Sequence, residues 1–348
     1  MVLQGIYDGP EKSRADIARE SGLTKVTVSD LVSELMANGL VIEARTSDEA
    51  RPGKRSTLLA FNAAGRDIVA LDLSFPDRFR GVVLSPRGQV LVSCDVLVEG
   101  ARGDAAIAAA AQLARELIAA APHPVLGIGV ATPGIVDASG TVVRAANLEW
   151  AGVPLAERLT AELGLPVFVE NDAKAAAAAE RRFAGMPDDL VRVNLSRGVG
   201  AGLLVGGLVV RGAASDAGEI GHVVVNADGV GCRCGKVGCL ETETSVPALR
   251  SRLAAEPEQA DRILADAGRW LGRALAPVVG MLGVQHLIVG GPDDLVTDDL
   301  LDSAHAFITE RTRSEFRPEL HVTASALTER AALLGVAALV LSAELGIR

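Results

Sequence analysis

The chain has 348 residues, of which 49% are hydrophobic and 22% are charged, and its 34 Lys and Arg against 44 Asp and Glu give a formal net charge of −10. The high apolar fraction excludes an intrinsically disordered chain, and the absence of a Gly-X-Y period excludes a collagen-like fibre. The acidic balance excludes a protein that wraps nucleic acid or an anionic membrane non-specifically, because such binding needs a positive field. It leaves room for one small DNA-reading module.

The first residues, MVLQGIYDGPEK, contain no basic stretch followed by an apolar core, so we predict no secretory signal. The most apolar helical runs, 105–121 and 331–343, are interrupted by polar residues or are too short to cross a bilayer. We therefore expect a cytoplasmic protein without a membrane partner.

Residues 1–62 have the pattern of a winged helix-turn-helix domain. Ser13, with Asp16 three residues later, predicts a helix that ends at Gly22, and Thr24 predicts a second helix that ends before Gly39. The strands LVIEA and TLLAF then flank the polar loop RTSDEARPGKRS, which would be the wing. This order is typical of DNA-binding domains, although any helical hairpin shares the helix spacing.

The cations of this segment are concentrated in the wing. Residues 1–60 hold 8 basic and 9 acidic residues, and four of the cations lie between positions 45 and 55. We expect Lys54 and Arg55 to contact the DNA backbone or the minor groove. Asp30, on the exposed face of the second helix, would repel phosphate or accept from a cytosine amino group. The candidates for contact with base edges lie at the front of that helix: Lys25, Thr27 and Ser29.

From residue 63 onwards the pattern predicts two related α/β lobes with a cleft between them, because the order βββαβαβ occurs twice. We place the first lobe at residues 63–186 plus about 326–348 and the second at 187–325. The predicted strands are 67–73, 79–85, 89–97, 125–131, 167–170, 190–196, 201–207, 208–212, 286–291 and 320–324, and the predicted helices are 104–121, 155–163, one from 172, 261–279, 300–312 and one at the C-terminal end.

One histidine and three cysteines predict a metal site. His222, Cys232, Cys234 and Cys239 follow the spacing H-x9-C-x-C-x4-C and supply the four ligands of a closed, structural zinc site. The alternative is three unrelated thiols in a loop of small residues.

Further polar residues indicate a ligand site. Asn171 and Asp172 follow the strand VFVE, at the end of a strand where ligands bind in α/β folds, and Asp172 has the chemistry of a general base towards a hydroxyl. The alternative role is to cap the next helix, and the two roles are compatible. Glu219 and Glu241 flank the cysteine loop and form either a clamp for a polyol or two solvated carboxylates.

Several motifs, TPGIVD, NLEW, LPVFVENDA and AGEIGH followed by CRCGKVGCLE, resemble the ROK family of sugar kinases and sugar-responsive repressors. The front segment SRADIARESGLTKVTVSDLVSEL is similar to that of the family's transcriptional regulators. The resemblance implies a duplicated, ribonuclease H-like α/β fold of the actin-like ATPase type, with a hexose in the cleft. It assigns sugar binding to five residues: Asn171, Asp172, Glu219, His222 and Glu241.

Departures from the family pattern argue against phosphoryl transfer. Kinase members have three nucleotide-binding loops, and each differs here. The first, Asp-x-Gly-Gly-Thr in kinases, is DLSFPD at 72–77 in this chain. The second, Gly-Thr-Gly, is replaced by Ser196-Arg197-Gly198, and the third, Gly-Gly-Gly, is replaced by Gly290-Gly291-Pro292. Side chains replace glycines whose backbone N–H groups would approach phosphates, and Pro lacks an N–H. We therefore expect no bound ATP or Mg²⁺ and no enzyme activity.

Together these features predict a sugar-responsive repressor that binds operator DNA as a homodimer or homotetramer. A sugar kinase with a fused DNA-binding head is the alternative, in which Asp172 would be the general base. A third interpretation is a zinc-stabilised interaction module whose sugar site no longer functions.

Overall fold

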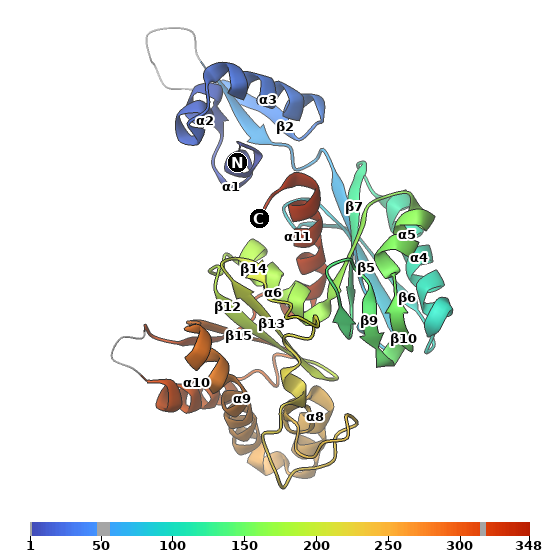
Figure 1. The fold of residues 1–348 in the computed structure, drawn as a ribbon, viewed down its shortest axis with the longest axis vertical. Helices are drawn as coiled ribbons and strands as arrows, with labels where there is room; N and C mark the ends of the chain where they lie inside the picture. The colour runs from blue at the N-terminus through green and yellow to red at the C-terminus, as the bar shows by residue number, and fades with distance from the viewer. Residues whose placement is uncertain (1, 47–55, 314–317) are drawn as a thin grey trace. The chain divides into compact units, whose positions relative to one another are not determined.

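The computed structural model describes residues 2–46, 56–313 and 318–348 (Figure 1). The chain forms two compact units, each built from segments that are distant in sequence. The first unit comprises Met1–Val130, Pro154–Val169 and Val336–Arg348, and the second comprises Ala131–Val153 and Glu170–Gly335. The domain boundaries given above stay a prediction.

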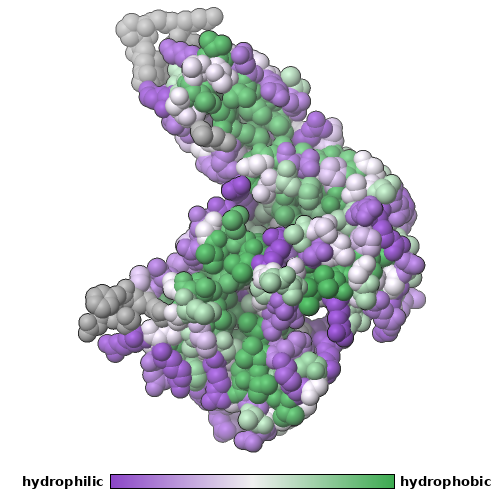
Figure 2. Space-filling view, viewed as in Figure 1, coloured by the Kyte–Doolittle hydropathy of each residue, from purple (hydrophilic) through white to green (hydrophobic). Residues whose placement is uncertain are grey.

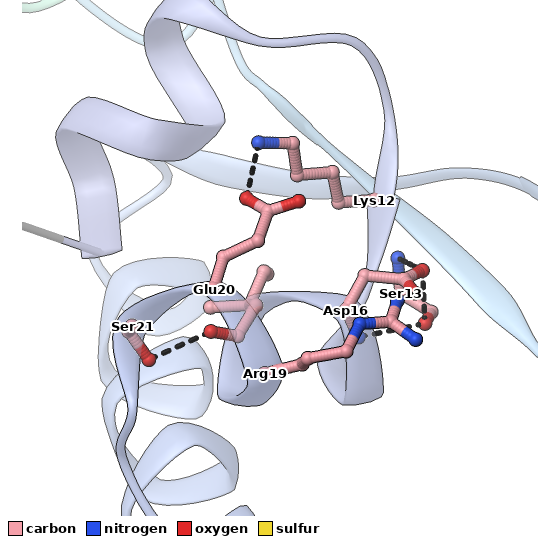
Figure 3. A network of polar contacts seen from close by, with 7 residues as sticks. Lys12, Ser13, Asp16, Arg19, Glu20 and Ser21 are labelled. Carbon is pink, nitrogen blue, oxygen red and sulfur yellow. Dashed lines mark hydrogen bonds and ion pairs between the residues drawn. The ribbon is translucent and has the colours of Figure 1, made fainter.

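The helix-turn-helix elements form as predicted at the start of the first unit. Ser13 caps α2 (Arg14–Ser21), and the Asp16 side chain in return accepts the Ser13 N–H at 3.2 Å, which completes a capping box (Figure 3). Gly22 ends α2 in the left-handed region, with φ of 70°. Thr24 then caps α3 (Lys25–Ala37).

The sheet of this head, residues 2–61, has the order β1-β3-β2 and is antiparallel. It consists of β1 (Lys12–Ser13), β2 (Val41–Thr46) and β3 (Thr57–Phe61). Helix α1 (Val2–Asp8) precedes it and was not predicted. Tyr7 of α1 is 1% exposed, packs edge-on against Phe61, and donates a hydrogen bond to the Pro86 carbonyl at 2.5 Å.

The first five-stranded sheet has the order β11-β7-β4-β5-β6. Gly81 in β5 lets α4 lie close to this sheet, since a Cβ at this position would come within 2.5 Å of Leu117. The strands are β4 (Asp67–Asp72), β5 (Arg78–Leu84), β6 (Val90–Leu97), β7 (Val125–Thr132) and β11 (Val167–Asn171). Helix α4 (Gly103–Ala120) connects β6 to β7, and α5 (Leu155–Leu163) precedes β11.

The second five-stranded sheet repeats this order as β16-β15-β12-β13-β14, which confirms the predicted duplication. In both sheets the first strand of the copy is central, flanked by a hairpin on one side and by two helix-connected strands on the other. The strands are β12 (Leu190–Leu195), β13 (Val199–Val205), β14 (Leu208–Val209), β15 (His286–Gly290) and β16 (His321–Ala324), and the helices are α6 (Asp172–Phe183), α9 (Ala260–Leu282) and α10 (Asp298–Thr312). The last helix, α11 (Ala331–Leu345), begins in the second unit and belongs to the first from Val336 onwards.

Helices α9 and α10 pack together and bury apolar side chains with β12 and β15 in one core that includes Leu271, Leu275, Leu300 and Ile308. On α6, the backbone carbonyl of Ala173 approaches β13 where Gly202 leaves space, because a Cβ there would lie 2.5 Å from that oxygen. This close packing fixes the N-terminal end of α6, where Asp172 lies.

Several short elements were not predicted from the sequence. A three-stranded sheet has the order β10-β9-β8, and two helices follow the cysteine loop. The bounds are β8 (Ile135–Val136), β9 (Val142–Ala145), β10 (Trp150–Val153), α7 (Leu240–Thr244) and α8 (Val246–Ala255), with 3₁₀ turns η1 (Ala146–Leu148), η2 (Ile220–His222), η3 (Pro257–Gln259) and η4 (Thr328–Arg330).

In the parts of the chain that the structure describes, no helix combines the length and the apolar character needed to span a bilayer.

Candidate functional site

The predicted metal ligands come together in the second unit. The candidate ligand atoms of His222, Cys232, Cys234 and Cys239 all lie within 4.8 Å of one another. The Cys234 and Cys239 sulfurs are 3.6 Å apart, and the Cys232 sulfur is 3.7 Å from Nδ1 of His222. Tetrahedral zinc with Zn–S bonds of about 2.3 Å requires sulfurs about 3.8 Å apart, so the donor set fits this ion.

The backbone of the cysteine loop folds around tight glycine turns. Cys232 donates its N–H to the Lys236 carbonyl at 2.7 Å, and Gly235 donates back to the Cys232 carbonyl at 2.9 Å. Gly238 adopts a φ of 67°, and a Cβ there would lie 1.4 Å from the Asn226 carbonyl oxygen, so no other residue fits. These turns bring Cys239 to the start of α7 beside the other three ligands.

The thiols of the cluster differ in how readily they lose a proton. Burial, with hydrogen bonds from the neighbouring thiols, raises the pKa of Cys239 to about 12. A hydrogen bond from the backbone of Lys236 lowers the pKa of Cys234. Zinc binds thiolates, so an ion at this site would have to offset the cost of a buried negative charge on Cys239.

Asn171 has all its hydrogen-bonding capacity used within the protein. Its Oδ1 accepts the N–H groups of Ala173 and Lys174, both at 3.0 Å, which caps α6. Its Nδ2 donates to the Gly134 carbonyl at 2.9 Å and to Oδ1 of Asp172 at 3.1 Å. An Asn side chain has two acceptor and two donor positions, so the predicted capping role is confirmed and Asn171 orients Asp172.

Glu219, His222 and Glu241 lie around the same end of α6. The pKa of Glu219 is raised by burial, while the charges of His222 and Lys174 oppose the rise and Glu241 adds to it. Close packing brings these residues to the start of α6: a Cβ on Gly221 would lie 2.1 Å from the Val199 carbonyl oxygen, and one on Gly200 would lie 3.3 Å from the Ala173 side chain. Glu241, on the first turn of α7, also accepts the Val199 N–H at 3.2 Å and thereby holds the loop before β13.

A buried network of charged side chains, which was not predicted from the sequence, lies next to this cluster. Lys174, 3% exposed on α6, donates to the Ser215 carbonyl at 2.5 Å, and burial lowers its pKa against the opposing charges of Glu170 and Glu219. Glu170 is ion-paired with Arg211 at 2.5 Å, and burial raises its pKa. The Ala-rich sequence of α6 has no large apolar residues to mark its buried face, so the burial of Lys174 could not be predicted from it.

The predicted DNA contacts are only partly described. Lys25, at the front of α3, is exposed and has no acidic partner among the described residues. The Thr27 hydroxyl lies 2.9 Å from that of Thr24, so it takes part in the cap of α3. The Ser29 carbonyl accepts from the Ser33 hydroxyl. The remaining candidates, Lys54 and Arg55, lie outside the described residues.

The three segments that the family resemblance matches to phosphate loops make contacts within the protein. At 72–77, Asp72 accepts the Ser74 N–H at 2.9 Å, and the guanidinium groups of Arg78 and Arg80 lie 5.4 and 5.3 Å from the centre of the Phe75 ring. In the second unit, the backbone of Ser196 donates to the Gly198 carbonyl at 3.0 Å.

At the third segment, Gly290 abuts the side chain of Arg192 and leaves no room for a Cβ. Arg192 is ion-paired with Glu180 at 2.9 Å, and both side chains are buried.

Comparison with known proteins extends over nearly the whole chain. A putative xylose repressor from Caldicellulosiruptor sp. (strain Rt8B.4) is 31% identical over 379 aligned positions, which cover 98% of this chain and 94% of the relative. A crystal structure of a ROK family transcriptional regulator, a homologue of the E. coli MLC protein, has a TM-score of 0.85 at 24% identity and covers 98% of this chain and 94% of its own. This likeness confirms the predicted fold, a duplicated α/β domain of the actin-like type behind a helix-turn-helix head.

Kinases are also related. A ROK family glucokinase from Streptomyces griseus, solved with glucose and AMPPNP, is 28% identical with a TM-score of 0.68, and the match covers 78% of this chain and 98% of the enzyme. Residues 104–343 match the ROK family itself. The chain therefore belongs to the ROK family.

Proposed function

We propose that this protein is a sugar-responsive transcriptional repressor. The observation that carries the proposal is that similarity to a protein named as a xylose repressor runs through the head as well as the ROK domain. The glucokinase match covers a smaller share of the chain. The capped helices α2 and α3 and their three-stranded sheet supply the DNA-reading element that a repressor needs.

On the DNA side, α3 enters the major groove with Lys25 at its front, while Lys54 and Arg55 of the wing contact phosphates or the minor groove. Helix-turn-helix proteins read paired half-sites, so the acting form is a homodimer or homotetramer in the cytoplasm. The head has no excess of positive charge, so its affinity for DNA depends on two heads binding together and falls with salt.

On the sugar side, Asp172, Glu219, His222 and Glu241 bind the hydroxyl groups of an aldose, and Asn171 holds Asp172 in place. The proposal is supported by the packing of the segment that carries Glu219 and His222 against Val199, which also donates to Glu241, next to the start of α6 where Asp172 lies. The ligand is a hexose, a hexose derivative or the pentose that gives the relative its name. Structural zinc on His222 and the three cysteines fixes the loop that carries this cluster.

The alternative, an ATP-dependent sugar kinase, has support from the glucokinase match. It requires backbone N–H groups free to receive phosphates. In this chain Phe75, Pro76 and Arg197 replace small residues of the kinase loops, and the Ser74 and Val199 N–H groups are already bonded to carboxylates. We therefore propose that the protein is not an enzyme.

Sugar binding and DNA binding are coupled when the sugar has different affinities for the two states of the protein. The test begins with selection of duplex DNA from a random library by the full chain. Binding of the selected duplex is then measured by fluorescence anisotropy at fixed salt, with and without each member of a panel: D-xylose, D-glucose, D-mannose, N-acetyl-D-glucosamine and the 6-phosphates of the hexoses.

One sugar is expected to change the DNA affinity by about 5- to 150-fold, the usual range of such coupling. Asp172→Asn and Glu241→Gln abolish this response, whereas Leu97→Ala, a substitution at a remote exposed position, keeps it. Absence of sequence-selective DNA binding, or a response to no sugar, contradicts the proposal. ADP release with any sugar that depends on Asp172 supports the kinase instead.

A further inference from the structure

The first turn of α3 has an exposed apolar side chain, that of Val26, in addition to the charged and polar candidates for DNA contact. Val26 is 70% exposed, whereas Val28 and Val32 of the same helix are completely buried in the core of the head. Figure 2 shows hydrophobic residues, in green, on the visible face of the head with hydrophilic residues, in purple, around them. Val26 therefore contributes little to the packing of the head, and its role has to be sought on the outer side of α3.

Local stability gives no reason for valine at this position. A β-branched residue is a poorer helix former than alanine, and an exposed apolar side chain gains nothing from burial in the folded monomer. The cap of α3 uses the hydroxyl groups of Thr24 and Thr27, which lie 2.9 Å apart. The side chains that the first turn presents to a partner are consequently those of Lys25 and Val26.

The first turn of a recognition helix is the part that contacts base edges. In the major groove, the 5-methyl group of thymine is the apolar feature that distinguishes one base from the others, and apolar side chains read it by contact. Lys25 beside Val26 supplies a cation for phosphate or for guanine, but it does not discriminate the methyl group.

We propose that Val26 packs against the 5-methyl group of a thymine in each half-site, and so makes thymine the preferred base opposite the front of α3. This inference rests on the proposed DNA-binding function and specifies what the head recognises. Asp30 lies one turn further along the exposed face, so the thymine adjoins the base that faces this carboxylate.

The test uses the full chain and the duplexes that it selects from a random library. Each thymine of the selected half-site is replaced in turn by deoxyuridine, which lacks only the 5-methyl group, and the Kd is measured at constant salt. At one position this replacement is expected to weaken binding by about fourfold per half-site, the equivalent of about 0.8 kcal/mol for one buried methyl group.

Val26→Ala is expected to bind the thymine and deoxyuridine duplexes equally. The matched control is Leu97→Ala, which removes another apolar side chain, 74% exposed, on β6 and leaves the fourfold ratio unchanged. The affinity of each variant for random-sequence DNA shows that its head is folded.

An undiminished ratio in Val26→Ala, or equal binding of all deoxyuridine duplexes by the unaltered protein, overturns the inference while DNA binding stands. If the unaltered protein selects no sequence at all, the proposed function fails, and the assignment of Val26 fails with it.

Discussion

Removal of the Asn171 side chain tests whether this residue positions Asp172 or itself contacts a ligand. Asn171→Ala deletes four hydrogen bonds at once: two that cap α6, one to the Gly134 carbonyl and one to Asp172. Because Asn171 is buried, water does not readily replace the lost partners.

The magnitude follows from these four bonds. Loss of an Asn cap costs about 1 kcal/mol of helix stability, and each further hydrogen bond that leaves a buried partner unsatisfied costs about 1 kcal/mol or more. The free energy of unfolding should therefore fall by about 2–4 kcal/mol. Asn171→Ser keeps a hydroxyl oxygen that can accept at the helix N-terminus, so we expect a smaller loss from this variant.

Tryptophan fluorescence during urea unfolding is a suitable assay, because both tryptophans of the chain, Trp150 and Trp270, lie in the second unit together with Asn171. The midpoint for Asn171→Ala should move to lower urea with little change in slope. An unchanged midpoint would refute the hydrogen-bond reasoning. A stable variant that has lost all sugar binding would show that Asn171 contacts the ligand directly.

Three further predictions concern side chains of the second unit. The purified protein should hold one equivalent of zinc in metal analysis, and Cys234→Ser should lose it. A variant with full zinc content would contradict the ligand set. Glu180→Ala should destabilise the fold by about 3–5 kcal/mol because it leaves Arg192 buried without its ion pair. The double variant Glu180→Leu with Arg192→Met should recover most of this loss, and equal losses in the single and double variants would exclude the unpaired charge as the cause. Burial raises the pKa of Glu170 above its value in the unfolded chain, so the folded state binds the proton more tightly. This contribution to stability is present at low pH and is lost as pH rises through the raised pKa. Glu170→Gln should flatten the slope of the unfolding free energy against pH, and an identical slope would contradict this prediction.

Elements with strong periodicity or end signals were predictable from the sequence. The capping residues Ser13 and Thr24 marked α2 and α3 correctly, and the second βββαβαβ order produced a sheet with the same strand order as the first. The metal cluster was predictable for a similar reason, since His222 and the three cysteines lie within 18 residues whose glycines allow only tight turns.

What escaped prediction depends on contacts between distant segments. Helix α1 has seven residues and no capping signal, and the described structure packs it through Tyr7 against Phe61 and Pro86, far along the chain. The saturation of Asn171 involves Gly134, 37 positions earlier. The pairing of Glu170 with Arg211 is likewise invisible to local patterns, because nothing near Glu170 indicates a buried cation.

The duplicated sheets have a consequence for protein engineering. In each copy, the loop that follows the first strand has a backbone N–H bonded to a carboxylate of the protein itself: Ser74 to Asp72 in the first and Val199 to Glu241 in the second. A phosphate at either loop would have to displace that loop's internal carboxylate before its own oxygens could accept from the N–H group. A design that restores glycines in the two loops therefore needs matching changes at the carboxylates, and at Glu241 such a change would also remove a side chain that we assign to the sugar.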